Sequence, residues 1–420
     1  MSHVGFFCFP GIGHLNPAIA LARRLQQRGH KLTMFHSRMA RPRLAAAGLG
    51  FWPLERQNFS TVKQTDENWF HIPRADLVQR LLANARCIVH EGPSAVSSAG
   101  VEALLIDQAV LAGGSVSDFL GLPYVTVCFF PPTILDASVP QTIFPWAYRN
   151  GHLARARNRM ANALICAMLR PVISEINKAR SSWNLPLIRT SNDTTSTLAM
   201  ISQMPESFDF PRENRCPHQF YTGPFRDIES RKHQQFPWER LNGRPLVYAS
   251  LGTVRNKTPR VFQLIAEACM CLDVQLVITL GGGSLTPEEL GSLPGDPVVV
   301  HYAPQIELLQ KASLAITHAG LNTTLESLAE GVPLVAIPVA DDQPGVAARI
   351  KWSGVGKVIF PRNLTVNALR RSLQETMNDK RYRQAAQAMK LRIGIMDGAS
   401  AAAKIAEDVL GLVAVRSDRS

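Results

Sequence analysis

A cluster of hydrogen-bond donors stands between His318 and Thr323, in the sequence His-Ala-Gly-Leu-Asn-Thr. Gly320 permits a tight turn there, and the backbone amides of residues 321–324 then open a predicted helix. The first amides of a helix have no intrahelical acceptor and, together with the helix dipole, they attract an anion. The side chains of His318, Asn322 and Thr323 add further donors. The pattern predicts an anion site, and a glycine turn with an Asn or Thr helix cap is the alternative.

Aromatic and polar residues lie at the ends of predicted strands on either side of this turn. Tyr302 and Gln305 lie at a predicted strand end, where an aromatic ring and an amide hold a flat base. Asp342 and Gln343 follow a later strand, and a carboxylate beside an amide satisfies the vicinal hydroxyls of a sugar. In chain order, the sequence therefore offers groups for a base, a diphosphate and a sugar.

The run from Tyr302 to Ala348 resembles the donor-binding signature of the family 1 nucleotide-sugar glycosyltransferases. That signature contains an aromatic residue, PQ, HxGxNS/T, E, GVP and DQ, and the spacing matches over about 45 residues. The resemblance implies a UDP-sugar donor. It also implies the GT-B fold, in which two Rossmann-like, doubly wound α/β domains face a cleft and the C-terminal domain binds the donor.

The resemblance assigns a role to each matching residue. Tyr302 would stack on the base, Gln305 would hydrogen-bond to it, and Glu326 would hold the ribose hydroxyls. The residues expected at the diphosphate are His318, Gly320, Asn322 and Thr323, and those expected at the sugar are Asp342 and Gln343. The turn at residues 250–253 matches the family's first C-domain loop near the nucleotide, which adds Ser250, Gly252 and Thr253.

Two departures from the family pattern bear on the donor and the acceptor. Plant-type members usually carry Trp where this chain has Tyr302, which keeps a stacking ring and leaves the base preference open. They also continue DQ with xxNA, whereas this chain reads DQPGVAAR over residues 342–349. That form resembles the bacterial zeaxanthin (carotenoid) glucosyltransferases within the family.

The N-terminal half contains a second matching loop, Gly-His-Leu-Asn-Pro at residues 13–17. In the family this histidine deprotonates the acceptor hydroxyl, so His14 is the expected general base. An imidazole with an ordinary pKa of about 6.5 accepts a proton at physiological pH. Asp107 follows a predicted strand, where the family places the carboxylate that orients the base. Taken singly, these residues are also typical of a helix start and a strand-end cap.

These residues need two sheets to bring them together. Apolar runs predict buried strands, with helices between them, at residues 3–9, 31–36, 87–89, 104–106 and 124–130. A second series predicts strands at residues 246–250, 275–280, 298–302, 314–317, 334–337 and 356–360. Alternation of this kind is typical of parallel sheets wrapped by helices, and ligands bind at the carboxyl ends of such strands.

The alternation divides the chain into two predicted domains. Residues 1–226 form the predicted acceptor-binding Rossmann-like domain, and residues 245–396 the predicted nucleotide-sugar-binding one. The polar, proline-containing stretch 227–244 is the predicted linker. Residues 397–420 form a C-terminal helix and tail, which we expect to pack back on the N-terminal domain.

A basic segment interrupts the first series, and residues 131–189 are predicted to be mostly helical. Residues 140–180 contain seven Lys and Arg against one acid, among apolar residues that include Phe144, Trp146 and Leu153. A basic face with exposed apolar residues favours peripheral contact with an anionic membrane. The alternative is that the apolar residues pack inward over the acceptor pocket and the arginines are solvated.

Composition limits the class of protein. With 46% hydrophobic and 19% charged residues, the 420-residue chain is predicted to be globular. No apolar run approaches the ~18–20 residues of a membrane span, and the first residues lack the basic region of a signal peptide. Seven scattered cysteines without a CxxC pair suit a cytoplasmic protein with reduced thiols. The net charge of +12 is not accompanied by a zinc finger or RNP-like motif, so nucleic acid is not an expected partner.

The expected activity is the inverting transfer of a hexose, glucose by resemblance, from a UDP-sugar to a hydroxyl of a hydrophobic acceptor, a carotenoid such as zeaxanthin. No metal or cofactor is expected, because the helix N-terminus and His318 would stabilise the leaving diphosphate. Macrolide or polyketide, sterol and flavonoid acceptors are alternatives. A nucleotide-sugar epimerase and a non-catalytic membrane-surface protein are alternatives of another class, and the intact His14, Asp342 and Gln343 favour transfer over both.

Overall fold

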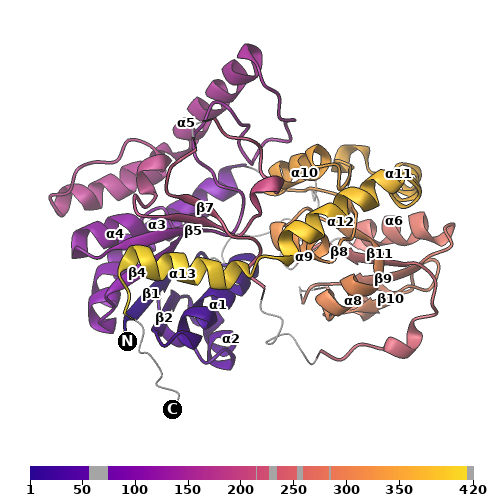
Figure 1. Cartoon of the computed structure of the whole chain (residues 1–420), viewed down its shortest axis with the longest axis horizontal. Helices are drawn as coiled ribbons and strands as arrows, with labels where there is room; N and C mark the ends of the chain where they lie inside the picture. Colours follow the sequence, from indigo (N-terminus) through magenta and orange to yellow (C-terminus); the bar gives the residue numbers. More distant parts are fainter. Residues whose placement is uncertain (56–73, 214, 227–233, 253–258, 283–284, 414–420) are drawn as a thin grey trace.

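Two α/β bodies lie side by side in the computed structural model, one for each half of the chain (Figure 1). The structure describes residues 1–55, 74–213, 215–226, 234–252, 259–282 and 285–413. Part of the predicted linker and all of Thr253 lie outside these ranges, so the expectation for Thr253 stays a prediction.

The first body is a parallel sheet of seven strands in the order β3-β2-β1-β4-β5-β6-β7. Its strands are β1 (His3–Phe7), β2 (Lys31–His36), β3 (Gly50–Pro53), β4 (Ala103–Asp107), β5 (Tyr124–Cys128), β6 (Met200–Ser202) and β7 (Gln219–Tyr221). Its helices are α1 (Ile12–Gln27), α2 (Arg41–Ala46), α3 (Arg74–Ala99), α4 (Gly113–Leu120) and α5 (His152–Ser182). Successive strand residues face opposite sides, so Phe6 packs in the core beside α1 and Phe7 in the core beside α3 and α4. Helices on both faces explain why these strands are apolar throughout.

The second body is a parallel sheet of six strands in the order β10-β9-β8-β11-β12-β13. Its strands are β8 (Leu246–Ser250), β9 (Gln275–Thr279), β10 (Val298–Val300), β11 (Ala312–Thr317), β12 (Leu334–Ala336) and β13 (Gly356–Val358). Its helices are α6 (Pro259–Met270), α7 (Pro287–Leu290), α8 (Gln305–Lys311), α9 (Leu321–Ala329), α10 (Gln343–Trp352), α11 (Val366–Asn378) and α12 (Lys380–Gly394). A last helix, α13 (Gly398–Leu410), follows.

Each sheet has a point where the order of its strands reverses. β1 lies between β2 and β4, and β8 lies between β9 and β11. Connections that leave neighbouring strands in opposite directions open a crevice at their carboxyl ends, which is where ligands bind in such sheets. Asp107 ends β4, and His14 lies in the first turn of α1, the helix that follows β1. Ser250 ends β8, and His318 directly follows β11. The reversal points therefore position both halves of the site.

The C-terminal helix α13 crosses back to the first body, where it lies against α1 (Figure 1). Ala402, Ala403 and Ala406 are buried in the same core as the apolar face of α1. Glu407 accepts hydrogen bonds from the guanidinium of Arg28 at 2.6–2.7 Å, and its carboxylate is 2.9 Å from the Nε2 atom of His30. Helix α13 is thus bound to the first domain by apolar packing and by charge.

A buried ion cluster joins the two bodies beside the cleft. The Arg349 guanidinium, on α10, donates to Oδ1 of Asp209 through Nε at 2.9 Å and Nη2 at 2.6 Å. Arg212 and Tyr221 bond to the other oxygen of the same carboxylate, at 3.2 and 2.5 Å. Burial opposes ionisation of Asp209, but the charges of Arg349 and Arg212 outweigh it and hold the pKa of this carboxyl well below its usual range.

Gly345 precedes this cluster by one helical turn and permits the close approach of the two bodies. A Cβ atom at Gly345 would lie 2.5 Å from the Cα of Thr142 in the first body. Packing between the domains therefore explains the sequence PGVAAR, which departs from the plant-type pattern. Gly345 permits the close contact with Thr142, and Arg349 forms the buried ion pair with Asp209.

Two expectations about local structure are wrong. Residues 87–89 are not a strand but lie inside α3, where Cys87 and Ile88 are buried against the helices on that face of the sheet. A short apolar run does not by itself distinguish a buried strand from a buried helix. The expectation of Phe144 at a membrane surface is also wrong, and the alternative of inward packing holds for this residue: it is 6% exposed and stacks on Trp146 with ring centroids 4.2 Å apart.

The ion cluster gives a stability prediction. Asp209→Ala leaves the buried Arg349 without its carboxylate, and we expect the free energy of unfolding to fall by about 3–5 kcal/mol. Asp379→Asn removes a carboxylate from an exposed pair with Arg381 and is expected to leave stability unchanged within error. Urea titration of both variants measures the difference. Equal stability of the Asp209 and Asp379 variants would contradict the role of the cluster.

Candidate active site

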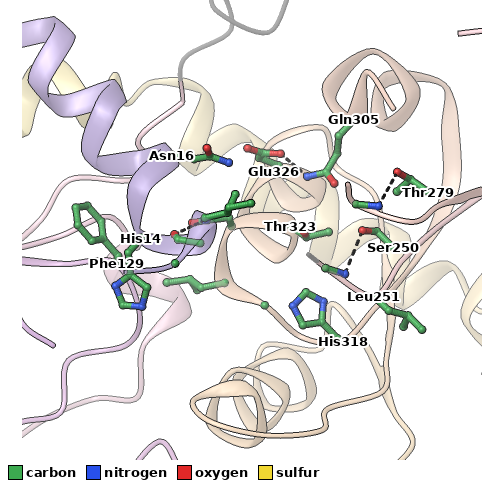
Figure 2. A pocket seen from close by; sticks show the side chains of 18 of the residues that line it. His14, Asn16, Phe129, Ser250, Leu251, Thr279, Gln305, His318, Thr323 and Glu326 are labelled. Atoms are coloured by element: carbon green, nitrogen blue, oxygen red, sulfur yellow. Dashed lines mark hydrogen bonds between the residues drawn. The ribbon is translucent and has the colours of Figure 1, made fainter. Parts of the chain in front are cut away.

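A cleft between the two bodies is lined by residues from both (Figure 2). His14, Asn16 and Phe129 come from the first body, and Ser250, His318 and Glu326 are among those that come from the second. Apart from Thr253, each predicted donor-binding residue lines this cleft, as does His14; Asp107 lies behind His14, fully buried.

Three hydroxyl residues lie in a row at the carboxyl edge of the second sheet, and two of them, Ser250 and Thr279, line the cleft. Ser250, Thr279 and Thr317 end neighbouring strands, and the register pairs Ser250 with each of the other two. Each hydroxyl oxygen accepts a hydrogen bond from the backbone N–H two residues further on, at 3.2–3.5 Å. The same side-chain-to-backbone bond thus turns the chain at the end of each of the three strands, where the loops that line the cleft begin.

The His318 ring lies between two glycines. A Cβ atom at Gly252 would come 2.7 Å from this ring, and one at Gly320 would come 2.4 Å from its Nε2 atom. Ala319 has a φ of +64°, a conformation that non-glycine residues adopt only under local constraint. Burial lowers the pKa of His318 to about 4, so the imidazole is neutral at physiological pH and presents an N–H donor rather than a charge.

The N-terminus of α9 faces the same space. Gly320 occupies the N-cap position and supplies no side-chain acceptor to the first amides of the helix. An Asn or Thr helix cap, the alternative interpretation of this sequence, is therefore not formed. Free first-turn amides beside the His318 ring make an anion-binding arrangement.

The side chain of Asn322 is engaged by the opposite body. Its Nδ2 donates to the carbonyl of Gly13 at 2.8 Å, and its Oδ1 accepts from Nε2 of Gln203 at 2.9 Å. Gln203 also donates to the carbonyl of Phe129 at 2.7 Å. The predicted contact of this side chain with a diphosphate competes with these bonds, whereas the backbone amide of Asn322 stays part of the helix N-terminus.

The end of the cleft predicted to hold the base and ribose contains a hydrogen-bonded chain. Gln305 donates through Nε2 to the carboxylate of Glu326, and its Oε1 accepts from the Tyr248 hydroxyl at 2.9 Å. Tyr302 packs against Gly282, where a Cβ atom would approach the ring to 3.2 Å. The predicted residues are thus brought together, and Tyr248 fixes the orientation of the Gln305 amide.

The opposite end, predicted to hold the sugar, is formed by the loop between β12 and α10. Gln343 accepts backbone hydrogen bonds from Val339 and Ala340 at 2.8 and 3.1 Å through Oε1, so this oxygen shapes the loop. Burial and the charge of neighbouring Asp341 raise the pKa of Asp342 to about 6. Asp342 therefore gains or loses its charge close to neutral pH.

His14 and Asp107 form a close pair. The His14 Nδ1 atom is 2.6 Å from Oδ2 of Asp107, which also accepts from the backbone N–H of Phe9 at 3.1 Å, while Oδ1 accepts from that of Ala109 at 3.0 Å. With Nδ1 donating to the carboxylate, Nε2 is left as the proton acceptor. Burial disfavours the charged imidazole, but the charge and hydrogen bond of Asp107 outweigh burial and raise the pKa of His14.

Aromatic rings surround this pair. The ring centroids of Phe9, Phe129 and Phe130 lie 5.4, 6.2 and 5.7 Å from that of His14. Side chains of this kind exclude water and favour a hydrophobic molecule beside the imidazole. These rings, like Asn16, Arg80, Tyr248 and Thr279, line the cleft without having been predicted from the sequence. The hydroxyl at the end of a strand neighbouring β8 was an available signal for Thr279.

The architecture matches solved glycosyltransferases. The crystal structure of the glycotransferase of kitacinnamycin aligns with a TM-score of 0.77 at 20% identity, covering 97% of this chain and 98% of that one. This match confirms the predicted α/β class and the GT-B fold.

Sequence comparison then gives the family. Residues 55–393 match the family described as UDP-glucoronosyl and UDP-glucosyl transferase, and the chain belongs to it. The zeaxanthin glucosyltransferase of Pseudescherichia vulneris is 29% identical over 98% of both chains. That of Pantoea ananas is 28% identical, over 98% of this chain and 96% of its own. The protein is a family 1 glycosyltransferase that uses a UDP-sugar.

The geometry of the His14–Asp107 pair predicts the pH dependence of transfer. A base must be neutral, so kcat/KM is expected to fall as the pH drops through the raised pKa of His14, above the ordinary value of about 6.5. Asp107→Asn removes the charge that raises this pKa and should move the acid limb to lower pH while lowering the rate. Asp118→Asn is the control, because it removes a carboxylate that pairs with Arg180 and not with His14. An acid limb unmoved in Asp107→Asn would contradict the assignment.

Proposed function

We propose that this protein transfers glucose from UDP-glucose to a hydroxyl of a hydrophobic acceptor of the carotenoid class, with inversion at the anomeric carbon. The observation that carries the proposal is the position of the His14–Asp107 pair at one side of a cleft whose other side presents the α9 N-terminus and His318. Similarity to two zeaxanthin glucosyltransferases over nearly the whole chain supports the acceptor class and the hexose. The aromatic rings around His14 support a hydrophobic acceptor.

The proposed mechanism uses a general base and an anion site. Nε2 of His14 takes the proton of the acceptor hydroxyl while Nδ1–H stays bonded to Asp107, which stabilises the imidazolium that forms. The acceptor oxygen forms a bond to the anomeric carbon as the bond from that carbon to the diphosphate oxygen breaks. UDP leaves with the electron pair, and the α9 amides with the neutral His318 N–H receive its developing charge. In this proposal the leaving group needs no metal or other cofactor.

Product analysis tests the proposal. Incubation with UDP-glucose and a panel of zeaxanthin, a macrolide, a sterol and a flavonoid should give a glucoside of zeaxanthin, detected by mass spectrometry. His14→Ala is expected to lower turnover by ~10²–10⁴ and to leave UDP affinity nearly unchanged, because it removes the base and no donor contact. A glucoside of another acceptor class would overturn the carotenoid assignment. Full activity of His14→Ala would overturn the mechanism.

We also propose that helix α5 holds the protein at an anionic membrane surface, on its cytoplasmic side, where such an acceptor dissolves. Leu153, Met160 and Leu164 are 89%, 75% and 45% exposed, and their spacing places them on one face of the helix. Arg159 and Arg170, on the same helix, are exposed as well. Among the described residues no helix is long and apolar enough to span a bilayer, so the proposed contact is peripheral.

The structure changes which arginines should be tested for this contact. Arg155 pairs with Glu213, and the Arg157 guanidinium lies 4.8 Å from the Trp146 ring centroid. Arg159 and Arg170 have no ion-pair partner among the described residues, and each adds on the order of 1 kcal/mol near an anionic surface.

Vesicle co-sedimentation measures the proposed contact. We expect binding to phosphatidylglycerol vesicles, no binding to phosphatidylcholine vesicles, and loss of binding at high salt. Arg159→Gln/Arg170→Gln should weaken binding. Lys380→Gln/Arg392→Gln, which removes two exposed cations from α12, should not. No binding to anionic vesicles at low salt, or equal loss in both double variants, would contradict the role of α5.

A further inference from the structure

An ion pair crosses the cleft at the end predicted to hold the sugar. Nη2 of Arg80, on α3, donates to Oδ1 of Asp341 at 2.8 Å, and Nε of Arg80 lies 3.3 Å from Asp76 one helical turn away. The Arg80 and Asp341 side chains are 22% and 31% exposed, and both line the cleft. The guanidinium is therefore shared between two carboxylates, one from each side of the cleft.

The lining of the cleft is acidic although the whole chain carries a net charge of +12. Among the described residues that line it, Arg80 is the one Lys or Arg, against four acids: Glu307, Glu326, Asp341 and Asp342. Two of these acids are neighbours at the sugar end, and the charges of both raise the pKa of His14. A ligand that brought a carboxylate to this end would meet the negative charges of Asp341 and Asp342. The nearby cation, Arg80, is already paired with Asp341.

The loop geometry holds Asp341 in place. Asp341 has a φ of +56°, the left-handed region, which Asp tolerates better than most residues. It stands directly before Asp342, the N-cap of α10, so its backbone is fixed by the start of that helix. The carboxylate that pairs with Arg80 thus projects from a backbone position that the loop and the start of α10 define.

We propose that the Arg80–Asp341 pair restricts the donor to neutral hexoses and excludes hexuronic acids. This inference rests on the proposed function, because it takes the sugar to lie beside Asp342 and Gln343. The description of the family names both glucuronosyl and glucosyl transfer, so its donors include sugars with a C6 carboxylate and sugars with a C6 hydroxyl. A C6 hydroxyl can bond to either partner of the pair, whereas a C6 carboxylate has Arg80 as its available cation and must displace Asp341 to reach it.

The proposal predicts that donor selectivity shifts toward hexuronic acids when Arg80 loses its pairing with Asp341. Asp341→Asn keeps the size of the side chain and removes its charge, so that Nη2 of Arg80, whose Nε still pairs with Asp76, can bond to a hexuronic acid. The affinity for UDP-glucuronate relative to UDP-glucose should rise by about tenfold or more, the effect of one charge-assisted hydrogen bond. Adding Arg80→Gln to this variant should abolish the gain.

Calorimetric titration of the full chain with UDP-glucose, UDP-glucuronate and UDP, without acceptor, tests the proposal. The wild type should prefer UDP-glucose, and the ratio should shift in Asp341→Asn and return in the double variant. Glu307→Gln removes one carboxylate from the other end of the cleft and should not shift the ratio. Unchanged UDP affinity in the variants shows that the nucleotide half is intact.

The outcomes separate this inference from the function on which it rests. An equal ratio in wild type and Asp341→Asn, a gain that persists in the double variant, or the same gain in Glu307→Gln would overturn the role of the pair while leaving glucosyl transfer in place. Failure of the wild type to bind either UDP-sugar would overturn the proposed donor and this inference with it.

Discussion

The side-chain amide of Asn322 connects the two chemical halves of the site. It donates to the carbonyl of Gly13, the residue before the proposed base, and it stands in the first turn of α9, whose amides form the anion site. Gln203 holds its oxygen and is bonded in turn to Phe129, beside His14. A general base works only within hydrogen-bond reach of its proton, so the relative position of the two domains is the constraint on which transfer depends.

The rest of the interface supports that position. The buried Arg349–Asp209 pair lies on α10, the helix that begins directly after Asp342, and Gly345 lets this helix approach Thr142 of the first domain. Loss of either partner would leave an uncompensated buried charge at the interface, so the pair constrains how α10 lies against the first domain. The α13 helix adds a second connection, since it follows the second domain in the chain and packs on the first. The buried ion pair and the packing of α13 thereby both hold the donor half against the acceptor half.

Much of the fold and the donor half could be predicted from the sequence because the signals are local. A few consecutive residues are enough to predict a strand end, a glycine turn and a helix start, as at His318 and Gly320. The strand predicted at residues 87–89 is wrong because three apolar residues are too few to show the periodicity that distinguishes a strand from a helix. The role of Asn322 could not be predicted, because its partners Gly13 and Gln203 are far away in the chain. The Arg80–Asp341 pair escaped for the same reason.

The most direct test of the account compares Asn322→Ala with His318→Ala by single-turnover transfer and by titration with UDP. If Asn322 holds the base over the donor, its loss should slow transfer by about tenfold or more, as expected from two lost hydrogen bonds, and change UDP affinity little. His318→Ala should weaken UDP binding, because that ring faces the anion site. A large loss of UDP affinity in Asn322→Ala with an unchanged rate of transfer at saturating donor would contradict the account, since it would make the Asn322 side chain a diphosphate ligand rather than the link between the domains.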